Sequence, residues 1–295
     1  MKNLLTLISN PANPALTDRI VTAYTAHLDQ VTAINWLSKA VAVDIFFDGD
    51  LDDAKIRLSP ELMTENFDFA FQQTDGRKKK LLVADMDSTI IQCECIDELA
   101  DFAGLKEKVS AITEAAMQGK LDFEQALRER VALLAGMEAT TLETVYQERV
   151  TLMPGATALV KTMNANSANT VLVSGGFTYF TERVASLTGF QVNRGNILDI
   201  KDGRLTGNVL DPIVDSTTKI NSLIEFREKA GLKPHEVMAI GDGANDIPMI
   251  QEAGLGIAYH AKPAAAKAAD IIIRHSDLTS LLFLQGYSDA EFVTG

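Results

Sequence analysis

Short apolar runs alternate with helical patterns over most of the chain after residue 80. Five runs have the length and composition of buried strands: 81–84, 170–173, 237–240, 255–259 and 270–273. Stretches with helical periodicity lie among them, at 179–187, 219–230 and 247–252. Strands that alternate with helices in this way form a mainly parallel sheet with helices on both faces. The pattern therefore predicts an α/β fold with a Rossmann-like parallel sheet.

The first 76 residues follow a different order. Strand-like runs at 4–9, 33–36, 40–47 and 67–72 accompany one clear helical pattern at 16–28, for which Thr17 is the expected N-cap. A polar segment with a turn-forming Asp75-Gly76 follows and ends in four basic residues, 77–80. We therefore predict a small α+β domain over residues 1–76 and a second domain over 77–295.

Two further features interrupt the alternation of strands and helices. Residues 95–150 contain helical patterns separated by many polar turns, so they predict a helical cap inserted between the first two strands of the sheet. Residues 195–210 predict a β-hairpin whose turn is Asp202-Gly203. No internal repeat and no low-complexity tract is recognisable in the sequence.

Charge and cysteine content exclude several classes of function. The formal net charge of −13 disfavours binding to nucleic acid or to a membrane surface, so the basic residues 77–80 are interpreted as a solvated linker rather than a nucleic-acid patch. Cys93 and Cys95 are too close for a good disulfide and too few for a zinc site, which predicts reduced, buried thiols in a cytoplasmic protein. The apolar run 4–8 resembles a β-strand more than the core of a signal peptide.

Residues with reactive or charged side chains stand where the predicted strands end. Asp85 and Asp87 follow the first strand, Ser174-Gly175 follows the second, and Asp242 follows the third. Because ligands gather beyond the carboxyl ends of parallel strands, these groups should share one crevice, which Lys219 reaches from a helix. Carboxylates suit Mg²⁺, whereas a hydroxyl, a backbone N–H of glycine and a lysine suit a phosphate.

Each of these elements has an ordinary structural explanation when it is taken alone. Asp85-Met86-Asp87 is compatible with an acidic turn, a Ser-Gly-Gly or Gly-Asp-Gly segment is a common loop, and a lysine at a helix start is usually solvated. Their order along the chain, each at the end of a suitable element, instead predicts a site that stabilises phosphoryl oxygens during transfer.

From about residue 78 onward the chain resembles the phosphoserine phosphatases of the haloacid dehalogenase superfamily, in which an aspartate is the nucleophile. The matching segments are DMDSTII at 85–91, EAAMQGKLDFEQALRERVALL at 114–134, VSGGF at 173–177, Lys219 and GDGANDIPMI at 241–250. The resemblance implies the haloacid dehalogenase fold with its helical cap. It also implies Mg²⁺-dependent hydrolysis of O-phospho-L-serine, the last step of serine biosynthesis by the phosphorylated pathway.

The resemblance implies a role for each residue at the strand ends. Asp85 would attack phosphorus and form an aspartyl phosphate, and Asp87 would protonate the leaving oxygen and then activate water. Two close carboxylates resist joint ionisation, so we expect a raised pKa for Asp87. Ser174, Gly175 and Lys219 would hold the phosphate. The implied Mg²⁺ ligands are Asp85, Asp242 and the backbone carbonyl of Asp87, with Asp246 supporting them or orienting Lys219.

The same resemblance assigns residues to the amino-acid part of the substrate. Glu94 would face its ammonium group, and Arg130 would bind its carboxylate through a planar guanidinium. Met117 and Phe123 would close over the substrate and exclude water. Asn245 would add a hydrogen bond on the substrate side. Without the resemblance, Glu94 and Arg130 are unremarkable surface charges on helices.

Several alternatives remain at this point. A dehalogenase has no use for the second aspartate, and a P-type pump would carry Lys-Thr-Gly-Thr after the first. Another small phospho-amino acid, such as phosphohomoserine or phosphothreonine, or transfer to another alcohol remains open. Residues 1–76 look like a shortened ACT module whose second helix, near 52–62, is weak. This module predicts serine sensing or a homodimer, or it is a structural appendage, and a regulatory amino-acid-binding protein is the alternative from another class.

Overall fold

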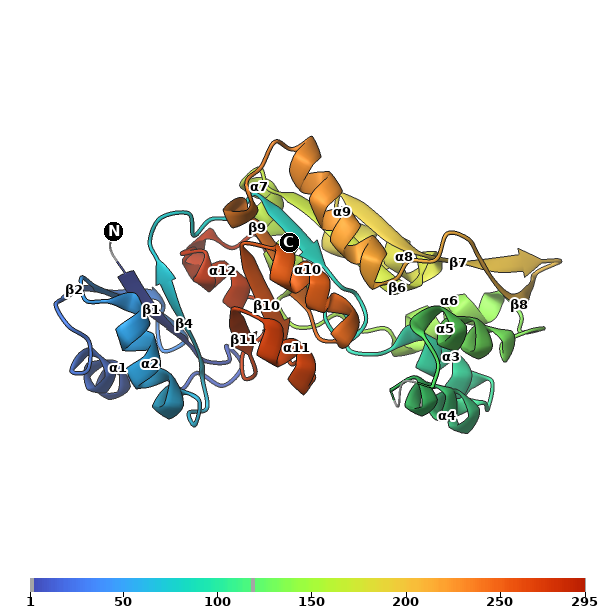
Figure 1. The fold of residues 1–295 in the computed structure, drawn as a ribbon, viewed down its shortest axis with the longest axis horizontal. Coiled ribbons are helices and arrows are strands. Elements are labelled where there is room, and N and C mark those ends of the chain that lie inside the picture. Colours follow the sequence, from blue (N-terminus) through green and yellow to red (C-terminus); the bar gives the residue numbers. More distant parts are fainter. Residues whose placement is uncertain (1–2, 118–119, 295) are drawn as a thin grey trace.

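Two β-sheets and a group of helices follow one another along the long axis of the protein (Figure 1). The computed structural model describes residues 3–117 and 120–294. A four-stranded sheet lies at one end, a seven-stranded sheet occupies the middle, and the helical cap lies at the other end. The N-terminal unit and the cap therefore flank the central sheet from opposite sides.

The N-terminal unit has the order βαββαβ. Its elements are β1 (Asn3–Ile8), α1 (Asp18–Thr25), β2 (Val31–Ser38), β3 (Ala42–Phe47), α2 (Leu51–Leu62) and β4 (Asp68–Gln73). The sheet order is β2-β3-β1-β4 and every neighbouring pair is antiparallel, which is the arrangement of ferredoxin-like units. The Thr17 hydroxyl accepts a hydrogen bond from the Ile20 amide, so the predicted N-cap of α1 is confirmed.

The expectation of a weak second helix was wrong. Helix α2 has 12 residues, and the Asp50 carboxylate caps it by accepting the Asp53 amide at 2.8 Å. Ala54, Leu58 and Leu62 recur every four residues and pack into the core of the unit. This single buried stripe stabilises the helix although its other positions are strongly polar. The unit is therefore not shortened.

The central sheet carries the expected α/β topology. Its strands are β5 (Leu81–Ala84), β6 (Asn169–Phe177), β7 (Val192–Lys201), β8 (Arg204–Leu210), β9 (Val237–Gly241), β10 (Leu255–Tyr259) and β11 (Ile271–Ile273). They are arranged in the order β11-β10-β9-β5-β6-β7-β8, and only the pairing of β7 with β8 is antiparallel. All five predicted strands are present, with β5 at the centre.

Helices cover both faces of this sheet. They are α7 (Ala156–Ala165), α8 (Thr178–Thr188), α9 (Ser216–Lys229), α10 (Ile247–Glu252), α11 (Pro263–Ala268) and α12 (Ser280–Leu284). Side chains alternate along β5, so Leu82 joins the core beneath α7, α8 and α12, whereas Leu81 and Val83 join the core beneath α9 and α10. Within residues 3–117 and 120–294, no helix is both long enough and apolar enough to cross a membrane.

The cap is joined to the central sheet by the β7–β8 hairpin. Its helices are α3 (Cys95–Phe102), α4 (Lys106–Met117), α5 (Phe123–Ala132) and α6 (Thr140–Arg149). The predicted turn is confirmed, and both Asp202 and Gly203 have positive φ. Unexpectedly, β7 also pairs with β6, so the hairpin is an arm of the main sheet. At the tip of the hairpin, the Gly203 carbonyl accepts a hydrogen bond from the Ala139 amide at 2.8 Å.

Two buried acidic residues attach the N-terminal unit to the central domain. Asp44 on β3 forms a two-pronged ion pair with Arg77, whose guanidinium also donates to the carbonyl groups of Phe283 and Leu284. Asp68 on β4 accepts hydrogen bonds from the backbone of 274–276, the segment that follows β11. Because the partners on both sides are buried, these contacts fix the unit against the central domain. The interpretation of residues 77–80 as a solvated linker is therefore wrong for Arg77 and Lys79, which are buried where the two units meet.

We predict that Arg77→Ala destabilises the protein far more than Arg57→Ala. Loss of Arg77 leaves the Asp44 carboxylate, 1% exposed, without its partner, which should cost about 3 kcal/mol of unfolding free energy. Arg57 forms exposed pairs with Asp53 and Asp29, so its loss should cost less than about 1 kcal/mol. Urea unfolding followed by the fluorescence of Trp36, the single tryptophan, measures both values. Equal costs would contradict the role given to the Arg77 pair.

Candidate active site

The polar residues that follow three adjacent strands converge at one edge of the central sheet. Asp85 follows β5, Ser174 lies near the end of β6, and Asp242 follows β9. Strands β9, β5 and β6 are neighbours and run parallel, so their carboxyl ends meet. The Asp85 amide still donates to the Ile240 carbonyl of β9, which holds the first aspartate in line with the sheet.

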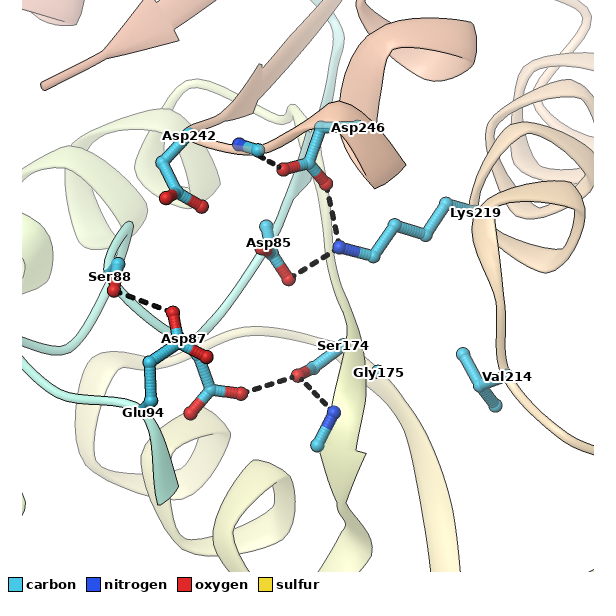
Figure 2. Close-up of polar contacts among 12 residues, drawn as sticks. Asp85, Asp87, Ser88, Glu94, Ser174, Gly175, Val214, Lys219, Asp242 and Asp246 are labelled. Carbon is cyan, nitrogen blue, oxygen red and sulfur yellow. Dashed lines mark hydrogen bonds and ion pairs between the residues drawn. The ribbon is translucent and has the colours of Figure 1, made fainter. Parts of the chain in front are cut away.

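A buried lysine joins two of the aspartates (Figure 2). The Nζ atom of Lys219, in the first turn of α9, lies 2.7 Å from Asp85 Oδ1 and 2.6 Å from Asp246 Oδ1. Burial lowers the pKa of Lys219, but the negative charges of Asp246 and Asp85 outweigh burial and raise this pKa above its ordinary value. Burial, helped by the Asp246 charge, raises the pKa of Asp85, and Lys219 opposes that rise. Lys219 is thus a fixed cation beside Asp85.

The carboxylates around Lys219 also fit a hard cation. Asp85, Asp242 and Asp246 each offer one oxygen, and these atoms lie within 4.8 Å of one another. Such an all-oxygen donor set suits Mg²⁺. The second Asp246 oxygen already accepts the Gly243 amide at 3.0 Å. Because both of its oxygens have protein partners, Asp246 is better placed to support the site than to be a direct ligand.

Asp87 has partners of another kind. Its Oδ1 accepts the Cys95 amide at 2.9 Å. Its Oδ2 accepts the Ser174 hydroxyl at 3.0 Å (Figure 2). Burial raises the pKa of Asp87, and these hydrogen bonds oppose the rise. No ion pair to Asp87 is present among the described residues. A carboxyl group with a raised pKa and no cation bound to it is suited to donate and accept a proton.

The loop after β6 is built around glycines. The Ser174 hydroxyl accepts the Gly176 amide at 2.8 Å. A Cβ at Gly175 would lie 2.9 Å from the Phe123 ring, and one at Gly176 would lie 2.6 Å from Asp87 Oδ2. Any larger residue would therefore displace the cap or the second aspartate. Phe123, at the start of α5, lies against this loop, and its expected role of closing over the substrate stays a prediction.

The remaining sequence-derived residues approach the same space from the cap and from the loop after β9. Glu94 Oε1 accepts the Ser88 hydroxyl at 2.8 Å, and burial raises the pKa of Glu94 to about 7. Burial lowers the pKa of Arg130, and the negative charges of Asp97, Glu94 and Asp87 oppose this change. The Arg130 guanidinium therefore lies near several carboxylates. Asn245 is half-buried, with its amide oxygen close to Gly243. The Met117 side chain lies outside the described residues.

Sequence reasoning missed three residues at this site. Ser88 has a positive φ of 56°, which places its hydroxyl on Glu94. Asn196, on β7, is fully buried and donates to the Gly175 carbonyl at 2.8 Å, so it fixes the loop after β6. Lys262 lies on the loop after β10. Strand β10 was predicted from the sequence, and ligands gather beyond the ends of parallel strands, so this rule could have identified Lys262. Cys93, expected to be buried, is half-buried, and Cys95 is buried.

Comparison with known proteins identifies the class. The family model of the haloacid dehalogenase-like hydrolases matches residues 82–251, so fold, site and sequence define a hydrolase of this class. A phosphoserine phosphatase of Albidiferax ferrireducens is 44% identical over 232 residues, which is 77% of this chain and 97% of that protein. The chain therefore belongs to the phosphoserine phosphatase family.

Solved structures agree with this assignment. The crystal structure of a probable phosphoserine phosphatase from Vibrio cholerae, in an unliganded form, has a TM-score of 0.79 at 34% identity, and the match covers 98% of this chain and 88% of that chain. A structure described as a phospho-aspartyl intermediate analogue of phosphoserine phosphatase has a TM-score of 0.65 at 39% identity. This match covers 70% of this chain and 98% of that chain.

The raised pKa of Glu94 predicts a pH-dependent effect of Glu94→Gln on stability. The pKa of the Glu94 carboxyl group is 4.5 in the unfolded chain and about 7 in the folded protein. As the pH rises from 4.5 through 7, the unfolded state loses this proton more readily than the folded state, so the folded state becomes less stable. The amide does not ionise, so Glu94→Gln should raise the melting temperature at pH 8 by a few degrees and change it little at pH 5. Differential scanning calorimetry without substrate or metal measures this. Glu129→Gln, an exposed neighbour of Arg130 on α5, is the control, and a gain independent of pH would contradict the argument.

Proposed function

We propose that the protein hydrolyses O-phospho-L-serine to L-serine and inorganic phosphate through an aspartyl phosphate on Asp85. The observation that carries the proposal is the unequal environment of two aspartates at the end of β5. Asp85 Oδ1 lies 2.7 Å from a buried lysine cation, whereas Asp87 accepts hydrogen bonds from an amide and a hydroxyl. One carboxylate is thus suited to attack phosphorus and the other to move a proton. Membership of the phosphoserine phosphatase family supports the choice of substrate.

In the first half-reaction an Asp85 oxygen forms a bond to phosphorus and the bond from phosphorus to the serine oxygen breaks. Asp87, in its protonated form, gives its proton to the leaving serine oxygen. The Lys219 ammonium, the Ser174 hydroxyl and the Gly175 amide stabilise the phosphoryl oxygens as their charge rearranges. Lys219 is held by its two ion pairs, and the loop that carries Gly175 is held by Asn196, before substrate binds, so these two donors need little reorganisation during the step.

In the second half-reaction water attacks the phosphorus of the aspartyl phosphate. Asp87, now a carboxylate, accepts a proton from that water, and the bond between phosphorus and the Asp85 oxygen breaks. Inorganic phosphate leaves, Asp85 is again a carboxylate, and Asp87 is again protonated. The Cys95 amide holds the Asp87 side chain in place through both steps. The Ser174 hydroxyl donates to Asp87 before substrate binds and turns to a phosphoryl oxygen when substrate is present.

The donor set supports Mg²⁺ as the cofactor. Asp85, Asp242 and the backbone carbonyl of Asp87 would hold it, and Asp246 would support them through Lys219 and Gly243. When bound, the ion neutralises charge on the phosphoryl oxygens. This addition also balances a site in which acidic residues outnumber basic ones.

The cap supports an amino-acid ester as substrate. Glu94 would pair with the ammonium group, Arg130 with the carboxylate, and Phe123 and Met117 would exclude water above the loop after β6. The acidic environment of Arg130 fits a residue whose counter-ion is partly supplied by the substrate. Asn245 would hydrogen-bond the substrate from the loop after β9.

For the N-terminal unit, residues 1–76, we propose a domain of the ACT type. Its βαββαβ order and its buried contacts with the central domain support a module that is docked rather than loosely tethered. Serine sensing and homodimer formation are the functions proposed for it. Calorimetric titration of the full-length protein with serine, in the presence of a substrate analogue that fills the active site, separates sensing from product binding.

Phosphate release measured across a panel of phosphomonoesters tests the proposed function. We expect Mg²⁺-dependent release from phosphoserine to exceed release from phosphothreonine, phosphohomoserine and an aryl phosphate. Chelation of the metal should remove the activity. A protein that hydrolyses phosphoserine no faster than the aryl phosphate would have another substrate.

Asp85→Asn should lower turnover of phosphoserine by at least about a thousandfold, because the amide is a poor nucleophile towards phosphorus. No phosphoenzyme should be recovered after acid quenching of the variant, although circular dichroism should report an intact fold. Asp52→Asn, which changes an exposed aspartate on α2, is the control with full activity. Retention of the phosphoenzyme by the Asp85 variant would exclude this residue as nucleophile.

Arg130→Ala should lower kcat/KM for phosphoserine by about 100-fold, as expected for loss of a charged two-pronged hydrogen bond. For phosphoethanolamine, which lacks the carboxylate, the loss should be less than about threefold if that bond is the only one removed. Arg128→Ala is the matched control, because Arg128 lies on the same helix but points to Asp211 and the Val209 carbonyl. Equal losses for both substrates would show that Arg130 does not read the carboxylate.

A further inference from the structure

The active site presents an electrostatic problem for its proposed substrate. Four buried or nearly buried aspartates surround it, namely Asp85, Asp87, Asp242 and Asp246. Lys219 is also fully buried, and its ammonium group is already paired with two of them. A phosphate ester with two negative charges must nevertheless enter this site on a protein of net charge −13. A cation that is accessible before the substrate is bound would assist that approach.

Lys262 has the position that such a cation requires. It lies on the loop between β10 and α11, and its side chain is 57% exposed. Its amide donates to the Asp242 carbonyl at 2.9 Å, and its Nζ lies 3.6 Å from Asp242 Oδ2. The Lys262 charge also lowers the pKa of Glu94, so its field reaches the cap side of the site. The exposed Lys262 ammonium therefore acts on both Asp242 and Glu94, which lie on two sides of the site.

The loop that carries Lys262 is held by a chain of hydrogen bonds. His260 has a positive φ of 43°, its amide donates to the Ile273 carbonyl at 2.8 Å, and its Nε2 lies 3.1 Å from the Ser276 carbonyl. The amide and hydroxyl of Ser276 in turn donate to Asp68 of the N-terminal unit. The backbone at Lys262 is thus fixed, while its ammonium group is exposed and lies 3.6 Å from Asp242 Oδ2.

We infer that Lys262 recruits the phosphate group of the incoming ester and passes it to the site beside Lys219. This inference rests on the proposed function, because it requires an anionic phosphomonoester as substrate. Lys262 is a recruiting residue rather than a catalytic one, since its ammonium lies at the exposed edge of the site beside Asp242. An exposed charge acts over a distance of about 10 Å at 0.1 M salt, so the attraction should be screened as salt increases.

Kinetics of Lys262→Gln at several ionic strengths test the inference. At low ionic strength we expect kcat/KM for phosphoserine to fall about tenfold, with kcat unchanged, and the loss to shrink as salt is added. Lys267→Gln removes the same charge from an exposed position on α11 and should leave kcat/KM and its dependence on salt unchanged. Lys262→Arg, which keeps the charge, should remain close to the unaltered protein.

The outcomes separate this inference from the proposed function. If the unaltered protein does not hydrolyse phosphoserine, the proposed function fails before Lys262 is tested. If it does, a Lys262→Gln variant with the salt dependence of the Lys267→Gln variant overturns the inference. A changed Mg²⁺ activation constant with an unchanged salt dependence also overturns it, because Lys262 would then act through Asp242 on the metal. Thermal unfolding of each variant checks that the fold is retained.

Discussion

The ion pairs of Lys219 are the constraint on which the rest of the site depends. A lysine with no exposed surface is tolerated only when its charge is paired, and here Asp85 and Asp246 lie 2.7 and 2.6 Å from it. These contacts join the end of β5, the first turn of α9 and the short 3₁₀ turn at Ala244–Asp246. Strand, helix and loop must therefore assemble correctly before the charges can be buried, and the assembled cluster is the phosphate site that we propose.

The cap, to which we assign substrate recognition, is tied to this rigid centre at two places. The Cys95 amide, at the start of α3, donates to Asp87, so the first cap helix begins on the second aspartate. At the far side, the β7–β8 hairpin continues the central sheet and hydrogen-bonds to the loop before α6 (Figure 1). These two contacts fix the cap to the second aspartate and to an arm of the central sheet.

Residues that act through their place in a regular pattern were predictable from the sequence. The central strands follow from apolar runs, and the convergence of Asp85 and Asp242 follows from parallel strands that share an edge. Asn196 was not predictable, because a buried amide that supports the Gly175 carbonyl leaves no local pattern. The stability of helix α2 was underestimated from the sequence. It depends on one stripe of core contacts and on the Asp50 cap, and the helix propensities of the residues reflect neither contribution. The docking of the N-terminal unit depends on the Arg77 pair, which forms across 33 residues of sequence.

The two aspartates of DMD differ because the fold gives them different partners. Asp85 directly follows β5, Asp87 lies in the turn two residues further on, and both carboxyl groups are buried in the same site (Figure 2). Asp85 meets an ammonium group that helps to keep it ionised, whereas Asp87 meets the ends of two neutral dipoles, the Cys95 amide and the Ser174 hydroxyl. In a buried environment an ion pair stabilises a carboxylate more than neutral donors do. One short strand end thereby carries the nucleophile and the proton donor that we propose, and the lysine that contacts only the first of these two aspartates distinguishes their environments.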